Sequence, residues 1–351
     1  MVKGLRIGHK YTLNEVCFVL FASVLLIMAV CYCDMTDYAV YYRQYVHMAQ
    51  SGRISTDYAF EAGYSLVSSI FATIGVPFNV YYGIYMGVAL FFLYRFIWKN
   101  LKNKTYCLFI FIIFPFINYL QQIRSVAGFV MILNALDSLY YNRTKKGYIK
   151  FLIWILIAAS FQVTNLGYAV LIIVPFFSYT AQKRWSIAVM LILPAMAFLF
   201  YDVAYNIMSR ISILNRIMYN LPEERTLTKF SLFNLLIFTV LMFLVVYIVR
   251  ISHKILTEKT LFFVKAALLI IMLQVLVCLS DNAYRLAVIG LPLVYVALLR
   301  VADETRSKFT RMLIYVGILI FAGITMFMYW GPVNPDMYKI LTEYMWKVRP
   351  Y

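Results

Sequence analysis

The fold class is decided by stretches such as residues 231–249, which read SLFNLLIFTVLMFLVVYIV and contain no charged side chain. A helix of this length, at about 1.5 Å per residue, crosses the roughly 30 Å hydrocarbon core of a bilayer. Comparable runs occupy residues 13–33, 78–98, 105–120, 126–141, 185–200, 262–280, 286–299 and 312–330. Helices satisfy their own backbone hydrogen bonds in lipid, so the sequence predicts an all-α polytopic membrane protein with about ten spanning helices.

The composition supports a chain with very little soluble mass. Hydrophobic residues make up 64% of the chain and charged residues 13%, whereas a soluble domain carries roughly 25% charged residues. The mean hydropathy is +0.79. We therefore expect residues 1–351 to form a single integral membrane domain, with polar segments on the outer side at residues 34–61, 201–230 and 331–351.

The net charge reflects topology. Lys and Arg together number 32 against 15 Asp and Glu, a balance that in a soluble protein indicates nucleic acid. Here the positive-inside rule accounts for it, because most Lys and Arg fall on one side when the short segments described next do not cross. This arrangement predicts a cytoplasmic N-terminus, an outer C-terminus and no nucleic-acid partner.

Three segments lack the continuous apolar length of a membrane-spanning helix. Residues 36–45 place Tyr38, Tyr41, Tyr42 and Tyr45 at helical spacing, which predicts an amphipathic helix lying on the membrane. Residues 63–76 are apolar but too short for the hydrocarbon core. Residues 151–179 are interrupted by polar residues at 160–165, so we expect a re-entrant hairpin whose polar tip is buried in protein or wet.

Polar side chains gather at the predicted outer boundary of the membrane. They are Asp37, Asp57, Glu61, Gln122, Arg124, Gln162, Asn165, Asp281, Tyr284 and Arg285. Charges at this depth are costly unless paired or hydrated, which makes them functional candidates. Each one alone is explained equally well by pairing with a neighbour or a lipid headgroup. The three histidines have surface contexts, and no cluster has metal-ligand spacing, so we expect neither a metal nor a cofactor.

The ordered set of motifs resembles a known family. The motifs are Thr36-Asp37-Tyr38 with Tyr41-Tyr42, Glu61-Ala62-Gly63-Tyr64, Gln122-Ile123-Arg124-Ser125-Val126-Ala127, Ser160-Phe161-Gln162-Val163-Thr164 and Tyr284-Arg285-Leu286. This series is similar to the EpsG-like family of bacterial exopolysaccharide proteins, which resemble Wzy-type O-antigen and capsule polymerases. It extends over most of the chain, from about residue 36 to about residue 300.

The resemblance implies a function and a location. Such proteins are expected to join oligosaccharide repeat units carried on undecaprenyl pyrophosphate, at the outer face of the bacterial inner membrane. Expected partners are this lipid-linked oligosaccharide and membrane lipid, together with a flippase and a chain-length regulator. The resemblance implies catalytic roles for Arg124, Arg285 and for Glu61 or Asp37. The family commonly has His at the hairpin tip where this chain has Gln162, and Gln cannot act as a general base.

The residues themselves agree with this chemistry. Arginine forks suit the oxygens of a leaving pyrophosphate, and a carboxylate is able to take the proton of an acceptor hydroxyl. We therefore predict Asp57, Gln122, Gln162, Asn165, Asp281 and Tyr284 as substrate-binding residues beside the four catalytic candidates. No nucleotide-binding motif is present, which favours a lipid-linked donor over a nucleotide sugar.

Two other classes of function stay open. A flippase or transporter of the same lipid-linked glycan is one, although transporters often carry internal repeats and place charges near the bilayer midplane. Another membrane glycan transferase, such as a ligase or an acyltransferase, is the second. An acyltransferase of this kind usually needs a histidine deep in the membrane, and none of the three histidines is expected there.

Overall fold

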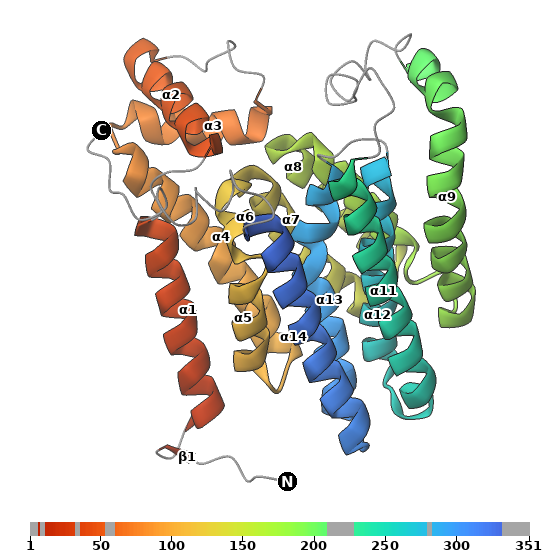
Figure 1. The fold of residues 1–351 in the computed structure, drawn as a ribbon. Helices are drawn as coiled ribbons and strands as arrows, with labels where there is room; N and C mark the ends of the chain where they lie inside the picture. Colours follow the sequence, from red (N-terminus) through yellow and green to blue (C-terminus); the bar gives the residue numbers. More distant parts are fainter. Residues whose placement is uncertain are drawn as a thin grey trace. The chain divides into compact units, whose positions relative to one another are not determined.

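A computed structural model describes residues 6–7, 11–31, 36–52, 60–208, 228–278 and 283–331. Two short strands precede the helices, β1 (Arg6–Ile7) and β2 (Tyr11–Thr12), and they pair antiparallel. The helices are α1 (Leu13–Cys31), α2 (Thr36–Ser51), α3 (Ala62–Thr73), α4 (Phe78–Asn100), α5 (Lys104–Ile113), α6 (Phe116–Gln121), α7 (Ile123–Tyr141), α8 (Lys145–Phe161), α9 (Tyr179–Met208), α11 (Lys229–Ser252), α12 (Glu258–Met272), α13 (Tyr284–Glu304) and α14 (Lys308–Trp330) (Figure 1). Three 3₁₀ segments complete them: η1 (Val163–Ile173), η3 (His253–Ile255) and η4 (Leu273–Cys278).

Six helices among the described residues are long and apolar enough to cross a membrane. They are α4, α7, α11 with η3, α12 with η4, α13 and α14. Their number and hydropathy make the chain a multi-pass membrane protein, as the sequence predicts. The total of about ten spanning helices stays a prediction, because α5 and η1 are apolar but shorter than the length of a full span.

Two predicted boundaries were wrong. The predicted span at residues 105–120 is broken, since α5 ends at Ile113 and α6 begins at Phe116. Pro115 stands at the break, and proline removes a backbone donor and clashes with the preceding turn of a helix. The predicted outer loop at residues 201–230 also starts too early, because α9 continues to Met208. No glycine or proline interrupts residues 201–208.

The two short segments before α4 both form helices, and a helix was predicted for the first of them. Helix α2 turns Tyr38, Tyr41 and Tyr45 inward, where all three rings are buried. Tyr45 packs against Tyr81 with ring centroids 5.0 Å apart, and its hydroxyl donates to the Val76 carbonyl at 2.6 Å. Burial raises the pKa of Tyr45 to about 12, so this donor stays protonated at neutral pH. Helix α3 is 12 residues long, too short to span, and its non-crossing placement remains a prediction.

The described helices divide into two compact units. Unit 1 comprises Met1–Ile172 and Tyr315–Tyr351, and unit 2 comprises Ile173–Ile314. In unit 1, α1 packs on α4 and α5, α4 packs on α7, and α7 packs on α8. These contacts bury an apolar core in which Leu90, Phe111, Phe129 and Leu133 are fully enclosed. The core is what fixes the first turn of α7 relative to α3 and α4.

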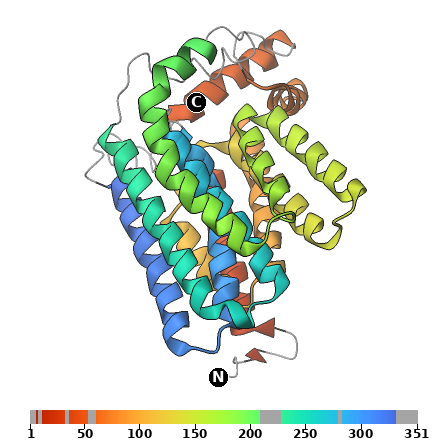
Figure 2. The same ribbon diagram turned by 90° about the vertical axis from the view of Figure 1, so that its right-hand side faces the viewer.

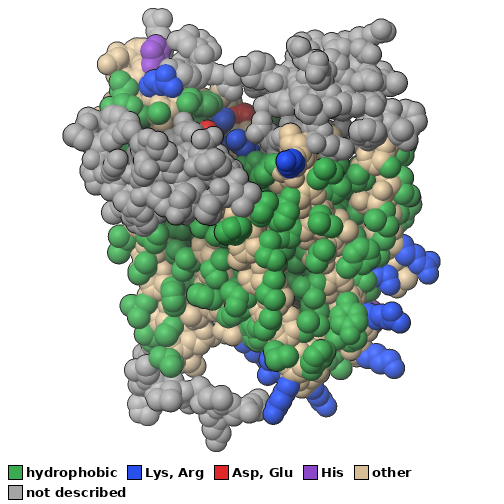
Figure 3. All heavy atoms as spheres, viewed as in Figure 1, with side chains coloured by type: hydrophobic (Ala, Val, Ile, Leu, Met, Phe, Trp, Pro, Cys, Tyr) green, Lys and Arg blue, Asp and Glu red, His purple; other side chains and the backbone are tan. Residues whose placement is uncertain are grey.

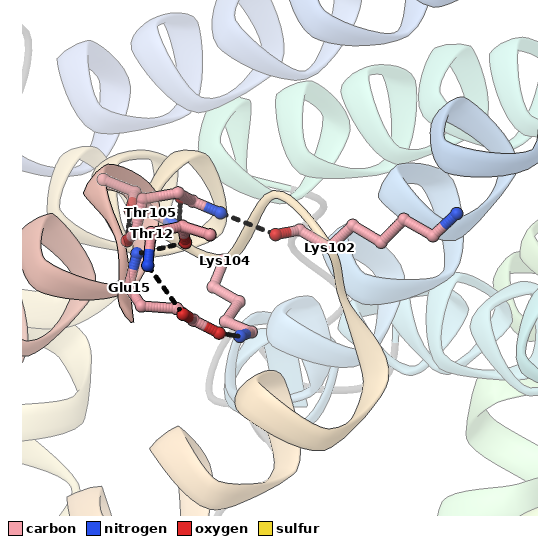
Figure 4. A network of polar contacts seen from close by, with 6 residues as sticks. Thr12, Glu15, Lys102, Lys104 and Thr105 are labelled. Carbon is pink, nitrogen blue, oxygen red and sulfur yellow. Dashed lines mark hydrogen bonds and ion pairs between the residues drawn. The ribbon is translucent and has the colours of Figure 1, made fainter. Parts of the chain in front are cut away.

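The basic end of unit 1 is held by ion pairs between neighbouring helices. Lys104 donates to Glu15 at 3.0 Å, while the Glu15 carboxylate also accepts from the Thr12 backbone N–H (Figure 4). Lys99 pairs with Asp137, which joins the last turn of α4 to the last turns of α7. Both ion pairs lie at the same end of unit 1, where α1 and α5 begin and α4 and α7 end.

The opposite end of unit 1 is formed by α2, α3, α6 and the starts of α4 and α7. The Tyr82 hydroxyl donates to the Leu120 carbonyl at 2.5 Å, and the Trp330 indole donates to the Asn118 side-chain oxygen at 3.1 Å. Helices α4 and α7 therefore run parallel between the two ends, with α5 and α6 returning between them. This end contains the charged pair described below.

Unit 2 is a bundle in which α12 packs against α9, α11 and α13 (Figure 2). Gly290 of α13 lies so close to α12 that an added Cβ would stand 2.4 Å from Ile270. Lys265 binds the carbonyls of Val174 and Phe177 at 2.6 and 2.9 Å, which fixes the chain entering α9. Hydrophobic side chains cover most of the helix surfaces on the face in Figure 3, as expected for helices in contact with lipid.

Candidate functional site

The central feature of the candidate site is an ion pair between Glu61 and Arg124. Glu61 is the residue immediately before α3, and Arg124 is the second residue of α7. The guanidinium Nη1 donates to the carboxylate Oε2. Only 16% of the Arg124 side chain and 10% of the Glu61 side chain are exposed. Two charges this far from water are stable only because they neutralise each other.

Aromatic rings surround the guanidinium. Its central carbon lies 4.3 Å from the centre of the Phe60 ring, 5.6 Å from Tyr41 and 5.8 Å from Tyr64. Ring faces carry negative charge and attract a cation at these distances. The Tyr41 hydroxyl also accepts a hydrogen bond from Nε at 3.4 Å. The terminal nitrogen Nη2 has no hydrogen bond to any described residue, so it is available to an anionic ligand.

The turn after α8 reaches the same pair. The backbone N–H of Val163 donates to Glu61 Oε1 at 3.1 Å, so the carboxylate joins α3, α7 and this turn. Asn165 donates from its side chain to the Ala158 carbonyl at 3.0 Å, seven residues earlier, which shows that the chain reverses here. Gln162 ends α8 in an extended conformation and is half-buried. The predicted hairpin tip at residues 160–165 is therefore a turn, whereas its depth in the membrane remains a prediction.

Two glycines permit the turn to approach this closely. A Cβ on Gly63 would stand 2.3 Å from the Ser160 hydroxyl oxygen, and one on Gly128 would stand 2.0 Å from the Asn165 side-chain nitrogen. Both distances are far below van der Waals contact. The turn is therefore able to pack against Glu61 only because Gly63 in α3 and Gly128 in α7 have no side chain.

Two buried amides beside the pair have unsatisfied polar atoms. Gln122 is 4% exposed and occupies the non-helical position between α6 and α7. Neither its side-chain oxygen nor its nitrogen bonds to a described residue, and the same holds for the side-chain oxygen of Asn165. Buried polar atoms are normally hydrogen-bonded, so these atoms are candidates for binding a ligand.

The remaining predicted site residues lie in α2, in unit 2 or outside the described residues. Asp37 lies in the first turn of α2 and forms no ion pair with a described residue. Tyr284 and Arg285 begin α13 in unit 2, where Arg285 is exposed and Tyr284 meets Phe230 edge-on with ring centres 5.4 Å apart. Asp57 and Asp281 lie outside the described residues. The catalytic role of Arg285 thus stays a prediction.

Sequence reasoning missed the aromatic shell and the backbone donor. Phe60 and Tyr64 flank Glu61 in the sequence, and Tyr41 stands in a motif that was recognised, yet none was predicted as a site residue. Their signal was masked because aromatic residues make up 18% of the chain. The Val163 N–H carries no sequence signal at all. Across the described ranges, no three His, Cys, Asp or Glu side chains gather closely enough to hold a metal ion.

Comparison with known proteins assigns the family. The EpsG family model matches residues 15–344 of the 351. The chain belongs to the EpsG family. This EpsG-family protein is thereby a membrane protein of polysaccharide biosynthesis, as the resemblance implied, and its multi-pass architecture agrees with that role. No curated protein and no solved structure matches the chain.

Proposed function

We propose that the protein is a membrane glycosyltransferase that polymerises oligosaccharide repeat units linked to undecaprenyl pyrophosphate. The product would be a surface polysaccharide such as an exopolysaccharide, a capsule or an O-antigen. The observation that carries the proposal is the buried Glu61–Arg124 pair at one end of the membrane helices of unit 1. Family membership supplies the coarse role, and the pair supplies two chemically suitable groups within contact of each other.

In the proposed reaction, Arg124 stabilises the leaving group. The bond between the anomeric carbon and the pyrophosphate oxygen breaks, and negative charge grows on that oxygen. The Arg124 guanidinium is a preorganised donor for that charge, with the Phe60 ring 4.3 Å from its central carbon and no hydrogen bond from Nη2 to a described residue. Arg285 is proposed to neutralise the rest of the pyrophosphate charge.

Glu61 is proposed to act as the general base. A hydroxyl of the acceptor saccharide attacks the anomeric carbon, and its proton passes to the carboxylate as the new glycosidic bond forms. Binding of pyrophosphate to Arg124 frees Glu61 from its ion pair at the moment a base is needed. Gln162 stands where the family commonly has His, and its side chain is unable to accept the proton. Glu61 is close to this position, because its carboxylate accepts a hydrogen bond from the backbone N–H of Val163, the next residue in the chain. Asp37 is the alternative base.

The remaining predicted residues bind the saccharide and the pyrophosphate. The unpartnered amide of Gln122 and the side-chain oxygen of Asn165 are proposed to bond sugar hydroxyls or phosphate oxygens near Arg124. Asp57, Gln162, Asp281 and Tyr284 are proposed to complete the substrate site. In the cell, the protein is proposed to act at the outer face of the inner membrane after a flippase delivers the donor.

A deletion strain tests polymerase against flippase and against other transferases. Loss of polymer with retention of a single repeat unit on the lipid, accessible from outside, is the expected result. Accumulation of that unit only on the cytoplasmic side would identify a flippase instead. Polymer of normal length that lacks an acyl group, or that stays on its lipid carrier, would identify an acyltransferase or a ligase.

A further inference from the structure

An apolar cavity of about 230 Å³ lies within unit 1, bounded by α3, α4, α7 and the last residue of α8. Its walls are aliphatic and aromatic, and no charged side chain lines it. Liquid water occupies about 30 Å³ per molecule, so the cavity has room for several atoms of a chain-like ligand. Water gains little in a cavity of this kind, and apolar cavities are filled by apolar ligands.

The cavity borders the surface that faces lipid. Ile84 and Val88 of α4 line it and are also 45% and 53% exposed. On a membrane helix, such exposed aliphatic side chains contact lipid chains. A hydrocarbon chain therefore has a lateral route from the bilayer into the cavity.

The cavity begins where the polar site ends. Ala127 and Met131 line it and follow Arg124 by three and seven residues, one and two turns along the same face of α7. Tyr85 lines it and packs edge-on against Tyr64, one of the rings around the guanidinium. Phe161 lines it just before the turn whose N–H binds Glu61. A ligand with its charged group at Arg124 and an apolar tail would continue into this space.

We infer that the cavity binds the first isoprene units of the donor's polyprenyl chain, next to its pyrophosphate. This inference rests on the proposed function for the identity of the lipid. In a polyprenyl phosphate the hydrocarbon begins directly at the phosphate oxygen. In a phospholipid, a glycerol and two ester groups come between phosphate and chain. Because the cavity starts one helical turn from Arg124, those esters would lie against its apolar walls.

The walls of the cavity contain few groups that could form a hydrogen bond with an ester. The hydrogen-bonding side chains that line the cavity are Tyr81 and Tyr85, and the Tyr81 hydroxyl is already bonded to Ser68 at 2.8 Å. The Tyr85 hydroxyl is buried and has no partner among the described residues. It lies within electrostatic reach of both Arg124 and Glu61. This phenol is therefore placed to donate to the phosphate oxygen that joins chain and head.

Binding of undecaprenyl phosphate to the purified full-length protein in phosphatidylcholine nanodiscs tests the inference. Val88→Trp fills the mouth of the cavity and is expected to weaken binding at least tenfold. Val80→Trp is the matched control, because Val80 is a similarly exposed valine of α4 that does not line the cavity, and it should bind as the parent does. Equal affinity of the two variants would overturn the inference.

Two further measurements keep the outcome interpretable. A photoreactive benzophenone residue at Met131 should form an adduct with undecaprenyl phosphate, while the same residue at Val80 should not. Phosphatidylglycerol that competes equally for the site would show that ordinary lipid fills the cavity, and this would also overturn the inference. If the parent binds the polyprenyl probe in the cavity but makes no polymer, the proposed function fails and the cavity remains a polyprenyl site.

Discussion

At the scale of single residues, the site is built on a partly buried ion pair without net charge. Glu61 accepts one hydrogen bond from Nη1 of Arg124 and a second from the Val163 N–H. An unpaired arginine in such surroundings is strongly destabilising, so the buried guanidinium of Arg124 needs this counter-ion. This counter-ion, Glu61, is also the proposed base.

The first prediction concerns the geometry of Arg124. Arg124→Ala should lower the polymerisation rate by about 10²-fold or more, the scale of losing one preorganised contact to developing charge. Arg124→Lys should also lose much of the activity, because an ammonium cannot bind phosphate oxygens with two parallel hydrogen bonds. Polymer length and rate are measured with lipid-linked donor in membranes. Full activity of the Lys variant would show that charge alone suffices.

The second prediction separates the chemical role of Glu61 from its structural role. In Glu61→Gln the amide oxygen still accepts from Arg124 or Val163, so the protein should insert and fold while polymerisation falls by about 10² to 10⁴-fold. Glu61→Ala should additionally lower the thermal stability, since it leaves Arg124 buried and unpaired. Retention of normal activity by the Gln variant would exclude Glu61 as the base and direct attention to Asp37.

The sequence identified Glu61 and Arg124 because a charge beside an apolar run is rare and costly. It missed Phe60 and Tyr64 because an aromatic residue in a membrane protein is ordinary, and only its distance from the guanidinium distinguishes it. The unsatisfied amide of Gln122 was predicted as a binding residue from its position next to Arg124. What sequence cannot supply is the partner of each group, because Glu61 and Arg124 stand 63 positions apart.

At the scale of elements, two glycines allow the turn after α8 to pack closely against α3 and α7. The polar residues at 160–165 predicted the interruption of this apolar run, but the close packing behind it depends on Gly63 and Gly128. The broken span at Pro115 and the long α9 show where the extent of an apolar run does not give the bounds of a helix. A proline inside an apolar run ends one helix at Ile113, while Pro194 is accommodated inside α9. Tertiary packing decides whether a proline ends a helix or is accommodated inside it, and the local sequence alone does not.

The third prediction tests that packing. Gly128→Ala adds a methyl group at a position 2.0 Å from the Asn165 side-chain nitrogen, and should destabilise the protein by roughly 1–3 kcal/mol. Gly323→Ala in α14 is the matched control, since an added Cβ there meets nothing within 4 Å. The control should be neutral or slightly stabilising, because Ala favours helix more than Gly does. Thermal unfolding in detergent measures both variants, and equal melting temperatures would contradict the packing described.

At the scale of the whole molecule, composition and charge asymmetry were sufficient to predict a multi-pass helical membrane protein. Within unit 1 the basic pairs Glu15–Lys104 and Asp137–Lys99 stand at one end, and Glu61–Arg124 stands at the other. The end with the Lys99 and Lys104 pairs also has Lys102 in its loop, so the positive-inside rule predicts that this end is cytoplasmic. The exact number of spans does not follow from hydropathy, because α3, α5, α6 and η1 are apolar yet short.

The fourth prediction is the orientation itself. A cysteine at Lys102, in the exposed loop before α5, should be protected from a membrane-impermeant thiol reagent in intact cells. A cysteine at Asn220 should be labelled from outside. The parent protein, with its five native cysteines, gives the background, and permeabilised cells give full labelling of Lys102→Cys. The reverse pattern would place Glu61 and Arg124 on the cytoplasmic side and would contradict the proposed site.

The fifth prediction is that Arg124 and Arg285 bind one pyrophosphate, although they belong to different units of the fold. Two arginines sharing one anion are coupled, so the effect of Arg124→Ala on the rate should depend on whether Arg285 is present. The double variant should then lose clearly less or clearly more activity than the product of the two single losses. The control is a second double-mutant cycle with Arg184, an exposed arginine of unit 2. The effects of Arg184→Ala and Arg124→Ala on the rate should combine without coupling. If Arg285 behaves like Arg184, it anchors α13 at a lipid headgroup, and a different cation must share the pyrophosphate charge with Arg124.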